Sequence, residues 1–381
     1  MTLERGLPIS PAEAADRVLE RARAYVEHET PSGHEPGLIA LAIRIEDELV
    51  AVGATVERHD APGRGRNLVA HVPGREPDAA PLVVLTHIDT VHPVGSLAQR
   101  PFSIHDGRVT GPGIYDMKCG AALVVEALAL LQEAGRHPRR PVAFLVTCDE
   151  EIGSQSARPL IEQYARLAGA VLVPEPCLPD GGVKTARKGV ATYRVRTTGH
   201  AGHAGLDPGI TVSAISEVID QCRAATALAR HDLGTTINIG TIGGGIATNV
   251  VAGEAWAGID VRLALPEEGE RIHAALLGLQ PVRAGAAVQV VRSESRPPLV
   301  RTPAVVALYQ QARALAAELG VELTEGASGG GSDGSLAAFW GAPTLDGLGA
   351  RGGGAHAASE HVLVADLPFR LAFLHALLDR L

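Results

Sequence analysis

Short apolar runs that alternate with helical stretches constrain the fold of this chain more than any other feature. Residues 82–86, 142–148 and 170–173 are almost wholly apolar, and the helical stretch at 121–134 stops at Gly135. A strand that is apolar on both faces belongs inside a sheet covered by helices. The alternation therefore predicts an α/β domain with a largely parallel sheet.

The pattern changes around Lys188, where half-exposed strands alternate with amphipathic helices. The expected elements follow the order β-α-β-β-α-β: 193–198, 208–229, 236–241, 255–265, 267–279 and 287–293. That order is typical of a ferredoxin-like unit. After Arg296 the buried pattern resumes and continues to the end of the chain. We therefore expect an α+β domain at 188–296, inserted into a first domain made of 1–187 and 297–381.

Charge and cysteine usage exclude several classes of protein. The net charge is −9, with Lys plus Arg 34 against Asp plus Glu 43, and no basic block is present. Such a chain is a poor ligand for nucleic acids and anionic membranes. The longest apolar stretch, 121–131, is too short to span a bilayer, and the N-terminus resembles no signal peptide. We expect a cytoplasmic protein, and the 4 cysteines form no CxxC pair that would indicate a thiolate zinc site.

Histidine and carboxylate side chains follow the ends of the expected parallel strands. His87 and Asp89 follow the first strand, residues 149–151 (Asp-Glu-Glu) follow the second, and Glu175 follows the third. Ligands of open α/β sheets bind beyond this edge. Two further residues of the same types lie in glycine-containing loops, Asp116 ahead of a helix and His356 near the C-terminus.

Each of these residues has an ordinary explanation when it is taken alone. Asp116 could cap the helix that follows it, and His356 could hold a backbone carbonyl. Together they are harder to dismiss, because unpaired carboxylates at one rim of a buried sheet need a cation to neutralise them. Imidazole and carboxylate ligands suit zinc, and one carboxylate can bridge two ions roughly 3.5–4 Å apart.

A hydrolytic centre of this type also needs a carboxylate that takes a proton from water without binding the metal. Glu150 and Glu151 could divide the two roles, because neighbouring side chains on an extended segment point in opposite directions. Asp89 could hold the second ring nitrogen of His87, the usual support for a zinc-bound imidazole.

Six motifs, taken in order, resemble those of one metallopeptidase family. They are THIDTV at 86–91, GPGIYDMKCG at 111–120, DEEIGS at 149–154, EP at 175–176, GHAGHAG at 199–205 and HAASE at 356–360. The family contains glutamate carboxypeptidase, acetylornithine deacetylase and succinyl-diaminopimelate desuccinylase. The resemblance covers nearly the whole chain. It implies a zinc-peptidase catalytic domain with an inserted ferredoxin-like dimerisation or lid domain.

The resemblance also implies a set of metal ligands. Two Zn²⁺ ions per chain are expected, with Co²⁺ or Mn²⁺ as alternatives. His87 and Glu175 would bind one ion. Glu151 and His356 would bind the other, and Asp116 would bridge the two.

Further roles follow from the resemblance. Glu150 would be the general acid and base, and Asp89 would orient His87. A histidine of the inserted domain stabilises the oxyanion in this family, often across a dimer. The spacing Gly-x-x-x-His-Ala-Gly selects His203 for that role rather than His200.

Substrate contacts are expected from four positions that match the family. These are Asn249, Arg262, and the glycine loop 329–334 with Gly330 and Ser332. Arginine is suited to bidentate recognition of a carboxylate. From the sequence alone, a surface salt bridge explains Arg262 equally well.

The leading functional expectation is hydrolysis of an amide bond beside a free C-terminal carboxylate, as in a glutamate carboxypeptidase. The alternatives are an N-acyl-amino-acid deacylase and a small dipeptidase, which share the same metal chemistry. A non-catalytic binding protein of the same fold is disfavoured because every expected ligand and Glu150 are present. The chain has neither a nucleotide-binding GxGxxG or P-loop nor a GxSxG serine elbow. A homodimer through the inserted domain is expected.

Overall fold

The computed structural model describes residues 7–206 and 209–381, which form two compact units. The first unit is discontinuous and comprises the chain up to Ala186 together with Arg301–Ser328 and Ser332–Leu381. The second unit comprises Arg187–Val300 and Gly329–Gly331. It begins at Arg187 where the sequence suggested 188, ends at Val300 where it suggested 296, and includes three glycines that were expected in the first domain.

The first unit is built on an eight-stranded mixed sheet. Its strand order is β1 (Thr55–Ala61), β2 (Gly65–Val72), β6 (Val142–Thr147), β3 (Leu82–His87), β7 (Ala170–Val173), β16 (Thr344–Asp346), β8 (Val183–Arg187) and β15 (Glu325–Ser328). The central strands β6, β3, β7 and β16 run parallel. The pairs β1–β2, β2–β6 and β16–β8 are antiparallel. The parallel sheet expected from the sequence is thus the central part of a mixed sheet.

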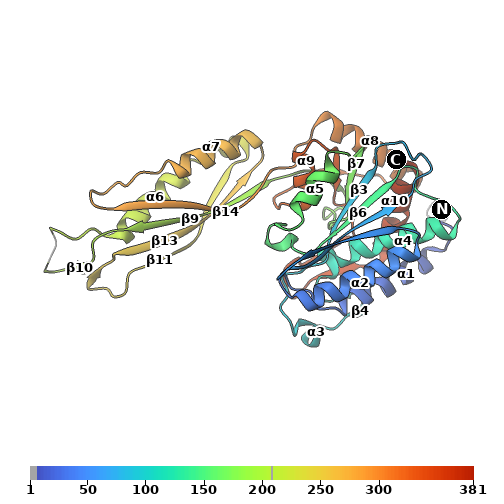
Figure 1. Ribbon diagram of the computed structural model, residues 1–381, viewed down its shortest axis with the longest axis horizontal. Helices are drawn as coiled ribbons and strands as arrows, with labels where there is room; N and C mark the ends of the chain where they lie inside the picture. Colours follow the sequence, from blue (N-terminus) through green and yellow to red (C-terminus); the bar gives the residue numbers. More distant parts are fainter. Residues whose placement is uncertain (1–6, 207–208) are drawn as a thin grey trace. The chain divides into compact units, whose positions relative to one another are not determined.

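Helices cover both faces of this sheet (Figure 1). One face packs against α1 (Pro11–Val26), α2 (Glu35–Ala51), α4 (Cys119–Glu133), α8 (Pro303–Glu318) and α10 (Leu367–Arg380). The other face packs against α5 (Arg158–Ala165) and α9 (Asp333–Phe339). Alternate residues of β3 divide between the two cores: Val84 belongs to the first cluster and Val83 to the second. The continuous apolar run of this strand exists because both of its faces are buried.

The second unit has the expected ferredoxin-like arrangement. Its elements are β9 (Gly189–Thr198), α6 (Ala214–Thr226), β11 (Thr236–Gly244), β13 (Glu254–Leu263), α7 (Pro266–Leu277) and β14 (Ala287–Arg296). The sheet order is β11-β13-β9-β14, and every adjacent pair is antiparallel. Both helices contact the sheet through one apolar core that includes Tyr193, Val218, Ile259 and Ile272.

Smaller elements complete the two units. A short helix α3 (Ser96–Gln99) follows β3, and a small sheet joins β17 (Gly352–Gly353), β18 (His361–Leu363), β5 (Arg108–Thr110) and β4 (Ser103–His105). In the second unit, β10 (Gly202–His203) pairs with β12 (Val250–Val251). No helix in the described parts of the chain has both the length and the apolar character needed to cross a membrane.

Two local expectations were wrong. The helix expected at 208–229 spans Ala214–Thr226. It begins at Ala214 because the Ser213 side chain accepts a hydrogen bond from the Ser216 N–H and caps the helix there. Residue 208 itself lies outside the described residues. The segment at Glu150–Ile152 is a short 3₁₀ helix and not an extended segment.

Candidate metal centre

The parallel strands deliver their following residues to one edge of the first unit. His87 is the last residue of β3, Glu150 and Glu151 follow β6, and Glu175 follows β7. Because β6, β3 and β7 are parallel neighbours, these loops lie at the same edge of the sheet. His87, Glu150 and Glu175 are buried, with His87 at 2% and Glu175 at 6% exposure, and the side chain of Glu151 is 8% exposed.

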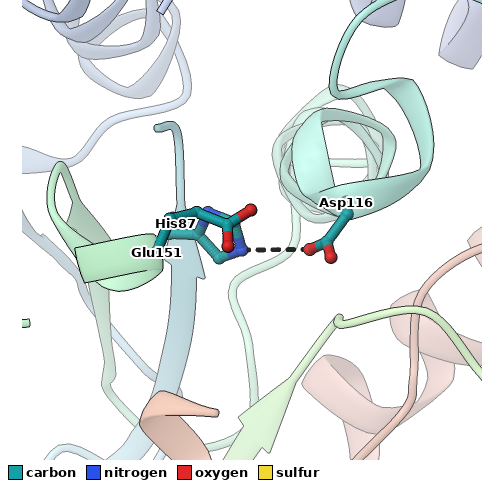
Figure 2. A group of neighbouring side chains, drawn as sticks. All are labelled: His87, Asp116 and Glu151. Atoms are coloured by element: carbon teal, nitrogen blue, oxygen red, sulfur yellow. Dashed lines mark hydrogen bonds and ion pairs between the residues drawn. The ribbon is translucent and has the colours of Figure 1, made fainter. Parts of the chain in front are cut away.

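Asp116 lies in the turn that enters α4, and it does not cap that helix. Its backbone is non-helical, with φ −119° and ψ 94°, and the capping position of α4 is occupied by Lys118. The Asp116 Oδ1 atom is 3.2 Å from His87 Nε2. Figure 2 shows this carboxylate directed toward His87 from the start of the helical segment, with Glu151 beside the imidazole.

The second oxygen of Asp116 faces the other histidine. Its Oδ2 atom is 3.4 Å from His356 Nε2, and that same nitrogen is 3.2 Å from Glu151 Oε2. On the first side, Glu175 Oε1 is 3.6 Å from His87 Nε2. The five residues therefore form two groups, each with one histidine and one glutamate, that share Asp116.

The backbone at His356 supports a functional explanation for this residue. Its φ is +63°, in the left-handed region that side-chain-bearing residues rarely adopt. Strain of this kind is kept where the surrounding structure needs a side chain in one place. The ordinary role of a loop histidine is therefore less well supported than the role of a ligand.

Asp89 is in contact with four neighbouring residues. The His87 Nδ1 atom is 3.0 Å from the Asp89 carbonyl and 3.4 Å from its Oδ1, so Nδ1 donates to Asp89 and Nε2 is the nitrogen that faces Asp116 and could bind an ion. The same carboxylate accepts from the N–H groups of Glu150, at 3.0 Å, and Glu151, at 3.1 Å. Ser32 donates its hydroxyl to Asp89 Oδ2 at 2.7 Å.

Sequence reasoning assigned Asp89 only to His87. It did not predict that Asp89 also accepts hydrogen bonds from the Glu150–Glu151 turn, and it did not predict the contact with Ser32. Ser32 is far from these motifs along the chain, so no local pattern could have indicated the contact. The sequence argument gave Glu150 and Glu151 different roles because side chains alternate on an extended segment. The segment is a 3₁₀ turn, so that argument does not apply.

The electrostatics of the group show an excess of negative charge. Burial lowers the pKa of His87, but hydrogen bonds to Asp116, Asp89 and Glu175 outweigh it and hold the pKa well above its ordinary value. Hydrogen bonds to Asp116 and Glu151 raise the pKa of His356 to about 10. Burial favours a raised pKa for Asp116, yet hydrogen bonds to His356 and His87 hold it below its usual range.

The pKa shifts of His87, His356 and Asp116 are those expected of a site that binds cations. Without an ion, protons on the two imidazoles supply the positive charge that the carboxylates require. A divalent ion must displace those protons, so affinity for the ion rises with pH. Burial also raises the pKa of Glu151, whose buried Oε1 atom has no hydrogen-bond partner among the residues that the structure describes. His87, Asp116 and Glu151 each offer a ligand atom, and these atoms lie within 4.8 Å of one another.

In the second unit, the structure places His203 beside Asn249. The strand residue His203 pairs with Val250, and the Asn249 carbonyl accepts from the Ala204 N–H at 3.0 Å. The Gly205 N–H donates to His203 Nδ1 at 3.1 Å. In the neutral imidazole the proton is then on Nε2, which makes that atom a donor.

The remaining expected substrate residues are engaged within the protein. Arg262 forms a bidentate pair with Asp260 at 2.8 and 3.0 Å. The Gly330 carbonyl accepts from Arg187 Nε at 2.8 Å. Ser332 is fully buried, accepts from the Gly334 N–H at the start of α9 and donates to Asp346 at 2.6 Å. Its hydroxyl is thus committed to the fold.

With this geometry in place, comparison with known proteins is informative. The model of peptidase family M20/M25/M40 matches residues 83–380. The chain belongs to this family. Carboxypeptidase G2 of Pseudomonas sp. (strain RS-16) is 32% identical over 361 residues, which cover 93% of this chain and 86% of that protein.

Other M20 relatives extend over nearly the full length. A succinyl-diaminopimelate desuccinylase of Methylorubrum extorquens (strain PA1) is 29% identical over 385 residues, with 95% and 98% of the two chains covered. The structure of aminopeptidase PepT from Bacillus cereus ATCC 10987 superposes with a TM-score of 0.81 at 24% identity, over 96% and 98% of the chains. This likeness confirms the fold. As an M20 member, the chain is a metallohydrolase that acts on amide bonds.

The shared position of Asp116 generates a prediction about metal content. If each of the two groups binds one ion, Asp116→Ala should lose both, because each group includes one oxygen of Asp116. His356→Ala should chiefly weaken one ion, because His87 and Glu175 do not depend on it. The check is metal analysis of each variant after dialysis at equal free zinc, with circular dichroism to establish folding. A folded Asp116→Ala protein that retains two ions would contradict the bridging geometry.

Proposed function

We propose that the protein is a dinuclear zinc carboxypeptidase, which hydrolyses an amide bond beside a free C-terminal carboxylate. The observation that carries the proposal is the carboxylate of Asp116, whose two oxygens face different histidines at 3.2 and 3.4 Å. His87 and Glu175 are the proposed ligands of one ion. Glu151 and His356 are those of the other. When bound, such ions polarise the scissile carbonyl and lower the pKa of water.

Glu150 is the proposed general acid and base. It is 8% exposed, and the bond from its N–H to Asp89 fixes its position next to Glu151. A carboxylate here takes a proton from the attacking water and returns it to the leaving amine. Asp89 thereby positions both the proposed proton shuttle and the proposed ligand His87.

His203 is the proposed donor to the oxyanion that develops on the scissile carbonyl. Its support is the Gly205 contact, which leaves the Nε2 proton available for donation. Asn249 is its neighbour and the proposed second contact to the transition state. For the substrate carboxylate we propose Arg262, which Asp260 already holds in one orientation, and the backbone of the loop around Gly330.

Two features of the relatives bear on the substrate. Carboxypeptidase G2 is a relative at 32% identity, which supports release of a C-terminal amino acid as the first candidate. The desuccinylase relative, aligned over 95% of this chain, favours N-acyl amino acid deacylation as the second. A purely binding role has less support, because the complete ligand set and Glu150 come together at one rim.

We also propose a homodimer formed through the second unit. β11 is an edge strand, and its sequence TINIGTIGG carries neither charge nor proline to discourage pairing. Beside it, α6 contributes Ile219, which is 40% exposed, while Ile242 of β11 is 55% exposed. Together with Cys222 and Ile239, these residues line a groove of about 570 Å³. A second copy would cover this apolar edge.

The function is tested by a hydrolysis panel on zinc-reconstituted protein, with and without chelator. C-terminal glutamyl peptides and N-acyl glutamates are compared with N-acetylornithine, succinyl-diaminopimelate and unblocked dipeptides. We expect chelator-sensitive release of a C-terminal amino acid. Selective cleavage of a small N-acyl amino acid would instead support the deacylase, and turnover that survives complete removal of metal would contradict both.

Glu150→Gln should keep both ions and lose about 10²–10⁴-fold in kcat, because the proton shuttle is gone. The matched control is Glu162→Gln, which changes an exposed glutamate paired with Arg166. That control should match the parent in turnover and in metal content. Metal analysis and initial rates are measured on the same samples, and near-parental turnover in Glu150→Gln would refute the assigned role.

The same variant tests action across a dimer. If His203 serves the partner's centre, a mixture of His203→Ala with Glu150→Gln should regain part of the activity after subunit exchange. A mixture that exchanges subunits but stays inactive would show that His203 acts within its own chain.

A further inference from the structure

Glu360 is a buried carboxylate that has no role in the proposed mechanism. It is 1% exposed and lies four residues beyond His356 in the same loop. Its Oε1 atom accepts from the N–H groups of Tyr115, at 2.8 Å, and Asp116, at 3.1 Å. Its Oε2 atom accepts from the Gly113 N–H at 3.0 Å. Three backbone donors of the turn that carries Asp116 thus converge on one side chain.

His92 provides a fourth donor to the same carboxylate. The His92 Nε2 atom is 2.5 Å from Glu360 Oε2, and its Nδ1 atom accepts from the Arg100 guanidinium at 3.2 Å. Because Nδ1 is an acceptor, the ring proton is on Nε2 and is donated to Glu360. His92 is itself 7% exposed, so this contact is shielded from water.

These contacts join three loops that carry proposed ligands. Glu360 belongs to the loop of His356, its backbone partners belong to the turn of Asp116, and His92 follows the strand that ends in His87. Arg100 also donates to the Ala357 carbonyl at 3.4 Å, next to His356. One buried carboxylate therefore links the bridging residue to the loops of both histidines.

We infer that Glu360 is a positioning residue of the metal centre: it holds the Asp116 turn and, through His92, the loop after His87 in the spacing that two bridged ions require. The inference rests on the proposed dinuclear centre. Glu360 is not itself a ligand, because each of its oxygens already accepts two hydrogen bonds. Glu360 can therefore affect the positions of the ligands only indirectly, through the backbone of Asp116 and through the loop after His87.

Glu360→Gln tests this role because the amide replaces one acceptor by a donor. In either orientation the new NH₂ group faces two N–H donors. His92 cannot relieve the conflict by moving its proton, since Nδ1 already accepts from Arg100. Loss of a supporting hydrogen bond of this kind typically weakens metal affinity about 10–100-fold.

The measurement is zinc affinity by competition with a chromophoric chelator, together with the visible absorption spectrum of the cobalt-loaded protein. We expect Glu360→Gln to bind at least one ion about 10–100-fold more weakly, with an altered cobalt spectrum. The matched control is Glu126→Gln, which changes a carboxylate that is 2% exposed and paired with Arg17 and Arg21. It should lower the melting temperature and leave affinity and spectrum at parental values.

A folded Glu360→Gln protein with parental affinity and spectrum would overturn the inference. If that variant does not fold, His92→Leu removes one contact and keeps the three backbone donors, so a smaller loss of affinity is expected. A folded His92→Leu protein of parental affinity would then overturn it. A parental protein that binds fewer than two ions would overturn the dinuclear centre itself and this inference with it.

Discussion

The structure depends on one electrostatic constraint, the burial of several carboxylates around two imidazoles at one edge of a sheet. Asp116 is the centre of this constraint because its two oxygens face His87 and His356 separately. Buried carboxylates are costly unless they are neutralised, and here protons on the imidazoles or metal ions can do so. The pKa values of both histidines are raised because the surrounding carboxylates stabilise their protonated forms.

The fold supplies this constraint in two stages. The central parallel strands bring His87, Glu151 and Glu175 to one edge, and an apolar core packs against each face of the sheet. The loops that carry Asp116 and His356 come from elsewhere and need their own support. Glu360, in the loop of His356, accepts hydrogen bonds from the Asp116 turn. Asp89 acts elsewhere, because it accepts from the Glu150–Glu151 turn that follows β6.

The sequence predicted the features that depend on local residue patterns, such as strand positions and the order of elements. The strand β7 has the bounds that its apolar run indicated, and the β-α-β-β-α-β order of the second unit is as expected. Local patterns were less reliable where a cap or a turn decides the backbone. The Ser213 cap shortened a helix, and the turn at Glu150 replaced an extended segment.

Contacts between distant residues could not be predicted in this way. Ser32 donates to Asp89, and Glu360 accepts from the turn of Asp116, yet no local pattern around Ser32 or Glu360 indicates either partner. The hydrogen bond of Ser332 is of the same kind, since Ser332 caps α9 and its partner Asp346 lies on β16. The histidine and carboxylate residues at this edge could be read from the sequence, and their role as ligands stays a prediction. The hydrogen bonds that position them depend on packing.

The most direct test is a crystal structure of the zinc-loaded protein with anomalous data collected at the zinc edge. The account predicts two peaks roughly 3.5–4 Å apart, each about 2.0–2.2 Å from a different oxygen of Asp116. One peak should adjoin His87 and Glu175, and the other His356 and Glu151. A single peak, or two peaks that share no carboxylate, would contradict the central claim.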